Sequence, residues 1–183
     1  MMKKLLFILL IFFACGSIPP TNYYTLDYPL PEANVEQQDV ALYIPRFRAQ
    51  TIYQKDNLIY KNEPYQYSFD PYRCWIDVPA NLLTQKACEY FRALDMFDKV
   101  STSLPRQPHY TLAATIISFE EVVENSTRSA SFGLWIEIVD PGEQLLWSGK
   151  LEKQQIISSR PKNWFIVSLR RLQSNSPSFA NSS

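Results

Sequence analysis

The sequence predicts an α+β domain in which an antiparallel sheet is covered on one face by two helices. Several stretches alternate apolar and polar residues with the period of two that is typical of half-buried strands. Two other stretches, residues 77–97 and 160–173, repeat apolar residues at helical spacing instead. No internal repeat is evident, and the length favours a single domain with its own core.

Short strands are expected before the first helix, joined by polar, proline-marked connections. Residues 39–45 place Val40, Leu42 and Ile44 on one face, as a half-buried strand does. The other segments are rich in aromatic and β-branched residues, which favour strands. The expected strand segments are residues 22–28, 39–45, 50–61 (two short strands about a turn at 55–57) and 63–70.

The first helix is expected over residues 77–97. Asp77 is a candidate N-cap, and Pro79 falls in the first turn, where a missing N–H costs little. The apolar stripe of this helix consists of Leu83, Ala87, Tyr90, Phe91 and Leu94.

Three longer strands and a second helix follow. Residues 129–140 put Phe132, Leu134, Ile136 and Ile138 on one side. In the second helix Phe165, Leu169 and Leu172 share one face. The expected elements are strands at residues 109–124, 129–140 and 144–157, a turn at 141–143 and a helix at 160–173.

The N-terminus has the pattern of an export signal. Lys3 and Lys4 precede the apolar residues 5–14, and Cys15 follows directly after Ala14. A membrane-spanning helix needs about 20 apolar residues, so this run is too short for a stable span. The small residue before a cysteine resembles the bacterial lipobox, although Phe12 replaces the usual leucine. An ordinary cleaved signal and an uncleaved membrane anchor are the alternatives.

A lipobox divides the chain into functional parts. Residues 1–14 would be the signal peptide, and 15–22 the lipidated Cys15 with its tether. Residues 23–173 would form the folded domain, and 174–183 a disordered Ser/Asn-rich tail. Gly16, in place of aspartate after the cysteine, resembles an outer-membrane address, so we expect a lipid-anchored domain that faces the periplasm.

Charge and cysteine content narrow the class of protein. Removing Lys3 and Lys4 from the 18 basic residues leaves 16 against 18 acidic residues, a formal charge of −2. No basic stripe is present, so a nucleic-acid partner is not expected. Cys74 and Cys88 remain for the folded domain, either as a disulfide of an exported protein or as two buried thiols.

No residue pattern indicates a catalytic centre, a metal site or a cofactor. His109 is the only histidine and is expected to be structural or solvated. Cys74 lies in no nucleophile signature, and the four glycines form no phosphate-binding loop. Glu120 and Glu121 are adjacent, so on a strand they would point to opposite faces. We therefore expect a protein that is not an enzyme.

Aromatic residues make up 14% of the chain and concentrate between residues 60 and 75. Tyr65, Tyr67, Phe69 and Trp75 are the candidates for a surface that binds a partner, because interfaces favour such side chains. The alternative is that they form one face of the sheet and pack beneath the first helix.

Several segments together resemble the ABC-type transport auxiliary lipoproteins. They are "YYTL" (23–26), "IYQKDNLIYK" (52–61), "YRCWIDVPANLLTQKACEYF" (72–91) and the two long strands with their turn (117–154). In that family a segment that ends in Arg–Trp leads into a helix with a Leu-Leu start. Here Arg73 and Trp75 match, with Cys74 between them, and the polar tail after Gln173 also departs from the family pattern.

The resemblance implies a non-enzymatic part of a lipid transport system between two membranes. The system would include an ABC permease with its ATPase and a mammalian-cell-entry type protein that carries lipids across the periplasm. The chain would dock or tether that system at the outer membrane, and self-association stays open. The alternatives are an outer-membrane assembly lipoprotein that aids lipopolysaccharide or β-barrel insertion, a lipid-anchored enzyme and a surface lipoprotein of another kind.

Overall fold

The computed structural model describes residues 18–31, 37–63, 65–125 and 127–157. Several predicted features lie outside these residues. They are the signal peptide at 1–14, Cys15 and the start of its tether, the helix at 160–173 and the tail at 174–183.

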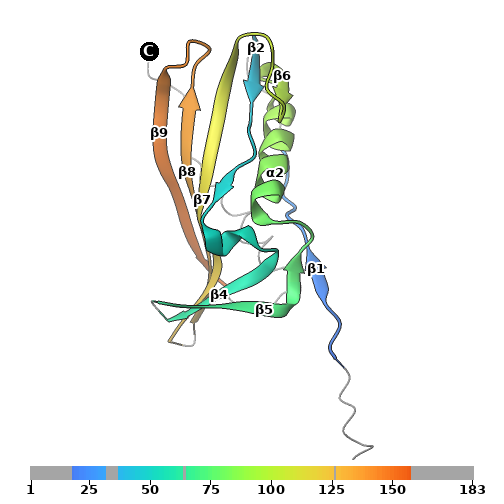
Figure 1. Cartoon of the computed structure of the whole chain (residues 1–183), viewed down its shortest axis with the longest axis vertical. Helices are drawn as coiled ribbons and strands as arrows, with labels where there is room; N and C mark the ends of the chain where they lie inside the picture. The colour runs from blue at the N-terminus through green and yellow to red at the C-terminus, as the bar shows by residue number, and fades with distance from the viewer. Residues whose placement is uncertain (1–17, 32–36, 64, 126, 158–183) are drawn as a thin grey trace, which may run out of the picture.

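The described chain is mostly β-structure, arranged as one strongly curled sheet with a single α-helix among the described residues (Figure 1). The predicted antiparallel sheet with two helices on one face is therefore wrong. The elements are β1 (Asn22–Tyr24), β2 (Gln38–Tyr43), β3 (Arg48–Ala49), the 3₁₀-helix η1 (Thr51–Gln54), β4 (Asn57–Glu63), β5 (Gln66–Trp75), α2 (Pro79–Leu94), β6 (Phe97–Ser101), β7 (His109–Glu124), β8 (Thr127–Val139) and β9 (Leu145–Ile156).

Strand β7 explains why the sheet is mixed. Along one edge it pairs in turn with β2, β3 and β4, and all three run parallel to it. Along its other edge it pairs antiparallel with β8, which in turn pairs antiparallel with β9. The segment from β2 to β4 therefore follows β7 in the same direction, and residue alternation within each strand carries no sign of this pairing.

Two local predictions are wrong because the segments concerned are short. Residues 51–54 form η1 and not a strand, although Tyr53 is buried as a strand residue would be. Residues from Phe97 onward form the short strand β6, whereas the predicted helix extended to residue 97. Short apolar segments of this length fit helix and strand equally well. The remaining strand segments are confirmed, with shifted ends.

Helix α2 confirms the most regular part of the sequence pattern. Its N-cap is Val78 and not Asp77, which lies one residue earlier. The Asp77 carboxylate instead accepts hydrogen bonds from the Val78 N–H at 2.7 Å and the Asn81 amide at 2.9 Å. The helix ends where Asp95 adopts a left-handed conformation, with φ of 52°.

Within the described ranges, no helix has the length and apolar character needed to cross a bilayer.

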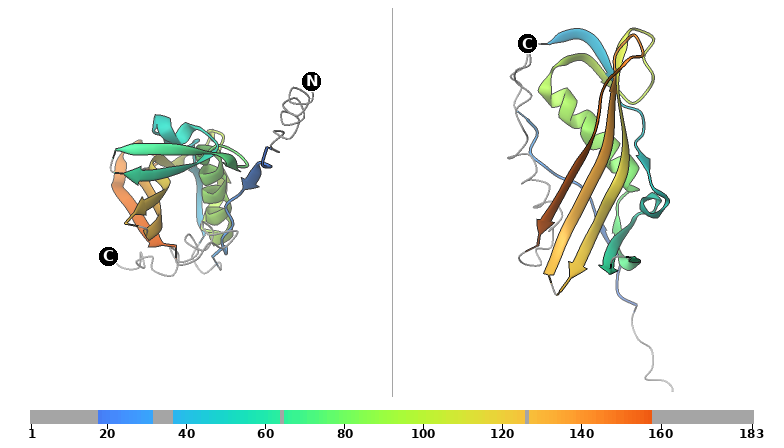
Figure 2. Two further views of the ribbon diagram at one scale, coloured as in Figure 1. Left: turned by 90° about the horizontal axis from the view of Figure 1, so that it is seen from below. Right: turned by 90° about the vertical axis from the view of Figure 1, so that its left-hand side faces the viewer.

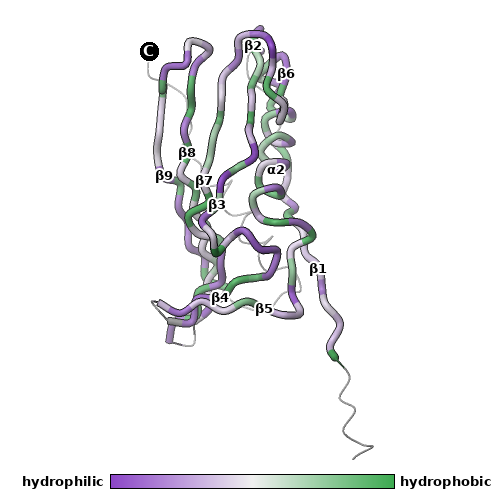
Figure 3. The backbone as a smooth tube through the Cα atoms, in the orientation of Figure 1, coloured by the Kyte–Doolittle hydropathy of each residue, from purple (hydrophilic) through white to green (hydrophobic). Residues whose placement is uncertain are grey.

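The core lies between α2 and the concave face of the curled sheet (Figure 2). Apolar residues recur along α2, β7 and β8 (Figure 3), and the inward-facing ones form this core. Its most deeply buried apolar side chains are Leu26, Ile44, Tyr53, Cys88, Ile116 and Phe119.

Thr84 connects α2 to the chain before β3. Its hydroxyl accepts a hydrogen bond from the buried Phe47 N–H at 2.8 Å and donates to the Ala80 carbonyl at 2.6 Å. We expect Thr84→Val to lower the free energy of unfolding by about 1–3 kcal/mol, because the Phe47 N–H loses its partner while the side-chain shape is kept. Urea denaturation of both proteins measures the difference, and an unchanged midpoint would contradict this role.

Candidate functional site

Exposed aromatic side chains gather on the hairpin formed by β4 and β5. We define the hairpin surface as Tyr65, Tyr67, Phe69 and Tyr72. Tyr65, between the two strands, is 97% exposed, and the other three are 38–39% exposed. Three of the four predicted partner-binding residues therefore lie on the protein surface. The fourth, Trp75, does not.

Two lysines pack on this surface. The Lys55 ammonium lies 4.5 Å from the centre of the Phe69 ring, and the Lys61 ammonium lies 5.9 Å from that of Tyr67. Cross-strand pairing accounts for the second contact, because Lys61 is opposite Tyr67 in the β4–β5 ladder. Two of the four aromatic rings of this surface therefore have a cationic group against them.

Trp75 belongs to the core and not to a binding face. It is 3% exposed, and its ring centre lies 5.0 Å from that of Phe119. The aromatic residues of 65–75 thus divide between surface and core along a single strand. The prediction of one shared face for Trp75 and the hairpin residues is wrong, because β5 runs from the exposed turn to a position beneath α2.

Beneath the hairpin, a buried carboxylate joins segments that are distant in the sequence. The Tyr53 hydroxyl donates to Glu120 Oε2 at 2.7 Å, and the Phe119 N–H donates to the same oxygen at 2.6 Å. Glu121 is also buried, but it pairs with Arg128. The two adjacent carboxylates therefore have separate partners. Sequence reasoning had no signal for the Tyr53–Glu120 contact.

Burial raises the pKa of Glu120, while the bonds from Tyr53 and Phe119 and the charge of Lys61 oppose this rise. Because the folded-state pKa of Glu120 is raised, its protonation contributes to the free energy of unfolding, and this contribution is fully present below the ordinary glutamate pKa of about 4.3. It is lost as the pH rises through the raised value. We therefore expect Glu120→Gln to gain stability relative to the wild type as the pH increases.

Urea denaturation of the wild type and of Glu120→Gln, at pH values from below the ordinary glutamate pKa of about 4.3 upward, measures how the difference in unfolding free energy changes with pH. Glu124→Gln, at the exposed end of the same strand, is the matched control. A difference between Glu120→Gln and wild type that stays constant with pH would contradict the expectation.

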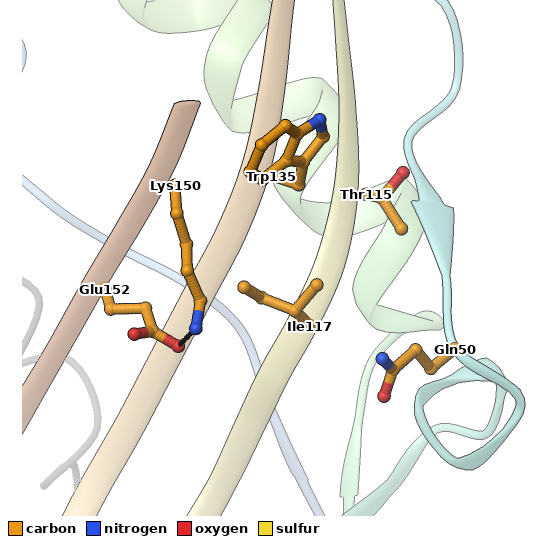
Figure 4. A pocket seen from close by; sticks show the side chains of 6 residues that line it. All are labelled: Gln50, Thr115, Ile117, Trp135, Lys150 and Glu152. Atoms are coloured by element: carbon orange, nitrogen blue, oxygen red, sulfur yellow. Dashed lines mark ion pairs between the residues drawn. The ribbon is translucent and has the colours of Figure 1, made fainter. Parts of the chain in front are cut away.

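A shallow groove of about 530 Å³ lies on the outer face of the sheet (Figure 4). Trp135, 42% exposed, is its largest side chain, and Lys150 and Glu152 form an ion pair of 2.5 Å across from it. The groove is lined by Gln50, Thr115, Ile117, Trp135, Lys150 and Glu152. Sequence reasoning missed it. The signal was available, because Trp135 alternates with the inward-facing Leu134 and Ile136.

A smaller hollow of about 210 Å³ adjoins this groove, and both share Glu152. Gly133 lies between the two. A Cβ atom there would lie 2.5 Å from Ser118 Oγ and 2.9 Å from Ile117 Cγ1. The absence of a side chain at Gly133 therefore leaves room for the side chains of Ser118 and Ile117.

Strand β9 also exposes apolar side chains. In the described ranges it pairs with β8 alone, so it forms an edge of the sheet. Its exposed apolar residues are Leu145, Leu146, Trp147, Leu151 and Ile156.

The remaining candidate residues have structural environments. Cys74 in β5 and Cys88 in α2 are free, buried thiols, and burial raises the pKa of each. The structure therefore describes the thiol alternative and not the disulfide.

The His109 ring packs edge-on against Tyr43, with Nδ1 2.9 Å from the Gln107 carbonyl oxygen. No group of three or more metal-binding side chains occurs in the part of the chain that is described.

The chain resembles known proteins in its fold and not in its overall sequence. No protein-family model matches the sequence. No curated protein matches it either. Among solved structures, the protein XCC0632 from Xanthomonas campestris, described with family model DUF330, is similar with a TM-score of 0.68 and 15% identity. The match covers 82% of this chain and 86% of that one.

A second solved structure, of an uncharacterized protein, is similar with a TM-score of 0.66 and 14% identity. It covers 84% of this chain and 91% of that one. At these identities the similarity concerns the backbone arrangement. The chain therefore shares its fold with a DUF330 protein.

Proposed function

We propose that this chain is a non-enzymatic, lipid-anchored component of an intermembrane lipid transport system and docks that system at the outer membrane. The observation that carries the proposal is the order of its segments. A lipobox-like Cys15 is followed by a short tether and then by β1, the first strand of a DUF330-type fold. The resemblance to ABC-type transport auxiliary lipoproteins agrees with this order.

Lipidation of Cys15 would provide the anchor. Each buried methylene contributes about 0.8 kcal/mol to membrane binding, so that a single myristoyl chain binds only reversibly whereas two or more chains bind stably. The tether Gly16–Asn22 has seven residues and spans at most about 25 Å when extended. A domain held this close to the bilayer is suitably placed to receive a partner that crosses the periplasm.

The partners in this proposal are a mammalian-cell-entry type periplasmic protein and, through it, an ABC permease complex. The exposed surfaces available for them are the hairpin surface, the groove at Trp135 and the edge strand β9.

Purification of the tagged full-length protein from detergent-solubilised membranes tests the partner assignment. We expect a mammalian-cell-entry type protein to be recovered with it, and not with an unrelated tagged outer-membrane lipoprotein used as control. Recovery of the lipopolysaccharide or β-barrel insertion machinery would instead support the assembly alternative. Recovery of neither would contradict the proposal.

A further inference from the structure

The N-terminal chain enters the fold at the end that carries the hairpin surface. Strand β1 pairs parallel with β5, with Asn22 opposite Arg73 and Tyr24 opposite Trp75. The pairing begins at Asn22, so the chain before it leaves the fold next to Arg73. Figure 1 shows β1 and the β4–β5 hairpin at the same end of the molecule. A tether attached to β1 therefore starts at the same end of the molecule as the hairpin surface, next to the last residues of β5.

Other exposed apolar residues surround this point. Ile18 is 84% exposed, and Tyr23 and Ile76 are each 66% exposed. Together with the hairpin surface they form a group that we call the tether end: Ile18, Tyr23, Tyr65, Tyr67, Phe69, Tyr72 and Ile76. Four of these seven side chains are tyrosines, which combine an apolar ring with a polar tip.

Such a composition suits the boundary between water and lipid. Tyrosine is enriched at both membrane interfaces, where its ring reaches the headgroup level. Lysine side chains can lie along apolar surface while their ammonium groups reach toward polar surroundings. Lys55 and Lys61 pack over Phe69 and Tyr67 and so place two cations among these rings. Anionic lipid phosphates are a complementary partner for them.

We propose that the tether end contacts the lipid headgroups of the membrane that anchors the protein, so that the domain is oriented and not merely tethered. This inference rests on the proposed lipidation of Cys15. The reach of about 25 Å for Gly16–Asn22 keeps the tether end close to the bilayer. The turn between β8 and β9, which lies at the opposite end in Figure 1, then points away from the membrane.

Depth-dependent quenching of a fluorophore tests the orientation. The full-length lipidated protein carries the probe at Tyr65→Cys and is reconstituted into vesicles of phosphatidylethanolamine and phosphatidylglycerol that contain nitroxide-labelled lipids. Gln144→Cys, in the turn between β8 and β9, is the matched control position. Cys74 and Cys88 are buried, so labelling in the folded state is directed to the introduced thiol.

We expect severalfold stronger quenching at position 65 than at position 144. Adding Tyr67→Ser and Phe69→Ser should reduce the quenching at position 65. Adding Leu145→Ser and Leu146→Ser, which change two more strongly exposed apolar residues on β9, should not. Equal quenching at the two positions, or an unchanged signal in the Tyr67/Phe69 variant, would overturn the inference.

Intact-mass measurement of the same sample separates this inference from the proposed function. A lipidated protein whose position 65 is not quenched retains the anchor and refutes the membrane contact, leaving the hairpin surface to a protein partner. A protein without added lipid refutes both.

Discussion

Replacement of Cys15 by alanine is expected to move the protein from the outer-membrane fraction into the soluble periplasmic fraction. The change removes the sulfur that would carry the acyl chains, and the ten apolar residues 5–14 are too few to span a bilayer in their place. Cell fractionation followed by immunoblotting measures the distribution.

Cys88→Ala is the matched control, because it removes a thiol that is buried in α2, far along the chain from the anchor. It should leave the protein in the membrane fraction. If Cys15→Ala remained wholly with the outer membrane, lipidation of this cysteine would not be the anchor.

Trp75→Ala is expected to lower the free energy of unfolding by about 3–5 kcal/mol, the usual cost of truncating a large buried aromatic residue. The side chain is 3% exposed and packs against Phe119 beneath α2. Its loss would leave a cavity at the junction of β5, β7 and the helix. Chemical denaturation at equilibrium measures the change.

Trp135→Ala provides the comparison, because the same side chain is 42% exposed in the outer groove. Its effect on stability should be small, since substitutions on the surface typically change stability by about 0.5 kcal/mol or less. Equal destabilisation by the two variants would show that Trp75 is not the core residue that the structure describes.

Local sequence patterns predicted the individual elements well where those elements are long and regular. The stripe of apolar residues on 79–94 predicted α2, and alternation predicted β8. The many β-forming residues of 109–124 predicted β7, and the turn at 141–143 predicted β9 as the partner of β8 in a hairpin. In α2 and β8 one periodicity extends over at least twelve residues, which is long enough to separate helix from strand. Residues 51–54 offered only four residues and were assigned to the wrong class.

The arrangement of the sheet could not be obtained in this way. Pairing of β2, β3 and β4 along one edge of β7 depends on contacts between segments about 60 residues apart or more. Each strand alternates identically whether its neighbour is parallel or antiparallel. The antiparallel arrangement was therefore the expectation for a run of short strands, and it is confirmed only for β4–β5 and β7–β8–β9.

The candidate surface was predicted in part. Tyr65, Tyr67 and Phe69 were candidates for an exposed aromatic surface, and the structure exposes all three. Trp75 was wrongly grouped with them, because the path of β5 from the surface into the core is a tertiary property. The proximity of the tether to this hairpin depends on the β1–β5 pairing, which no local pattern indicates.

The central claim is that fatty chains on Cys15 attach this domain to a membrane. Intact-mass spectrometry of the native protein, purified from detergent-solubilised membranes, tests it most directly. The account predicts a mature chain that begins at Cys15 and carries the mass of about two or three acyl chains, which is what stable anchoring requires. A mature chain with no added lipid mass, or one that begins at another residue, would contradict the claim.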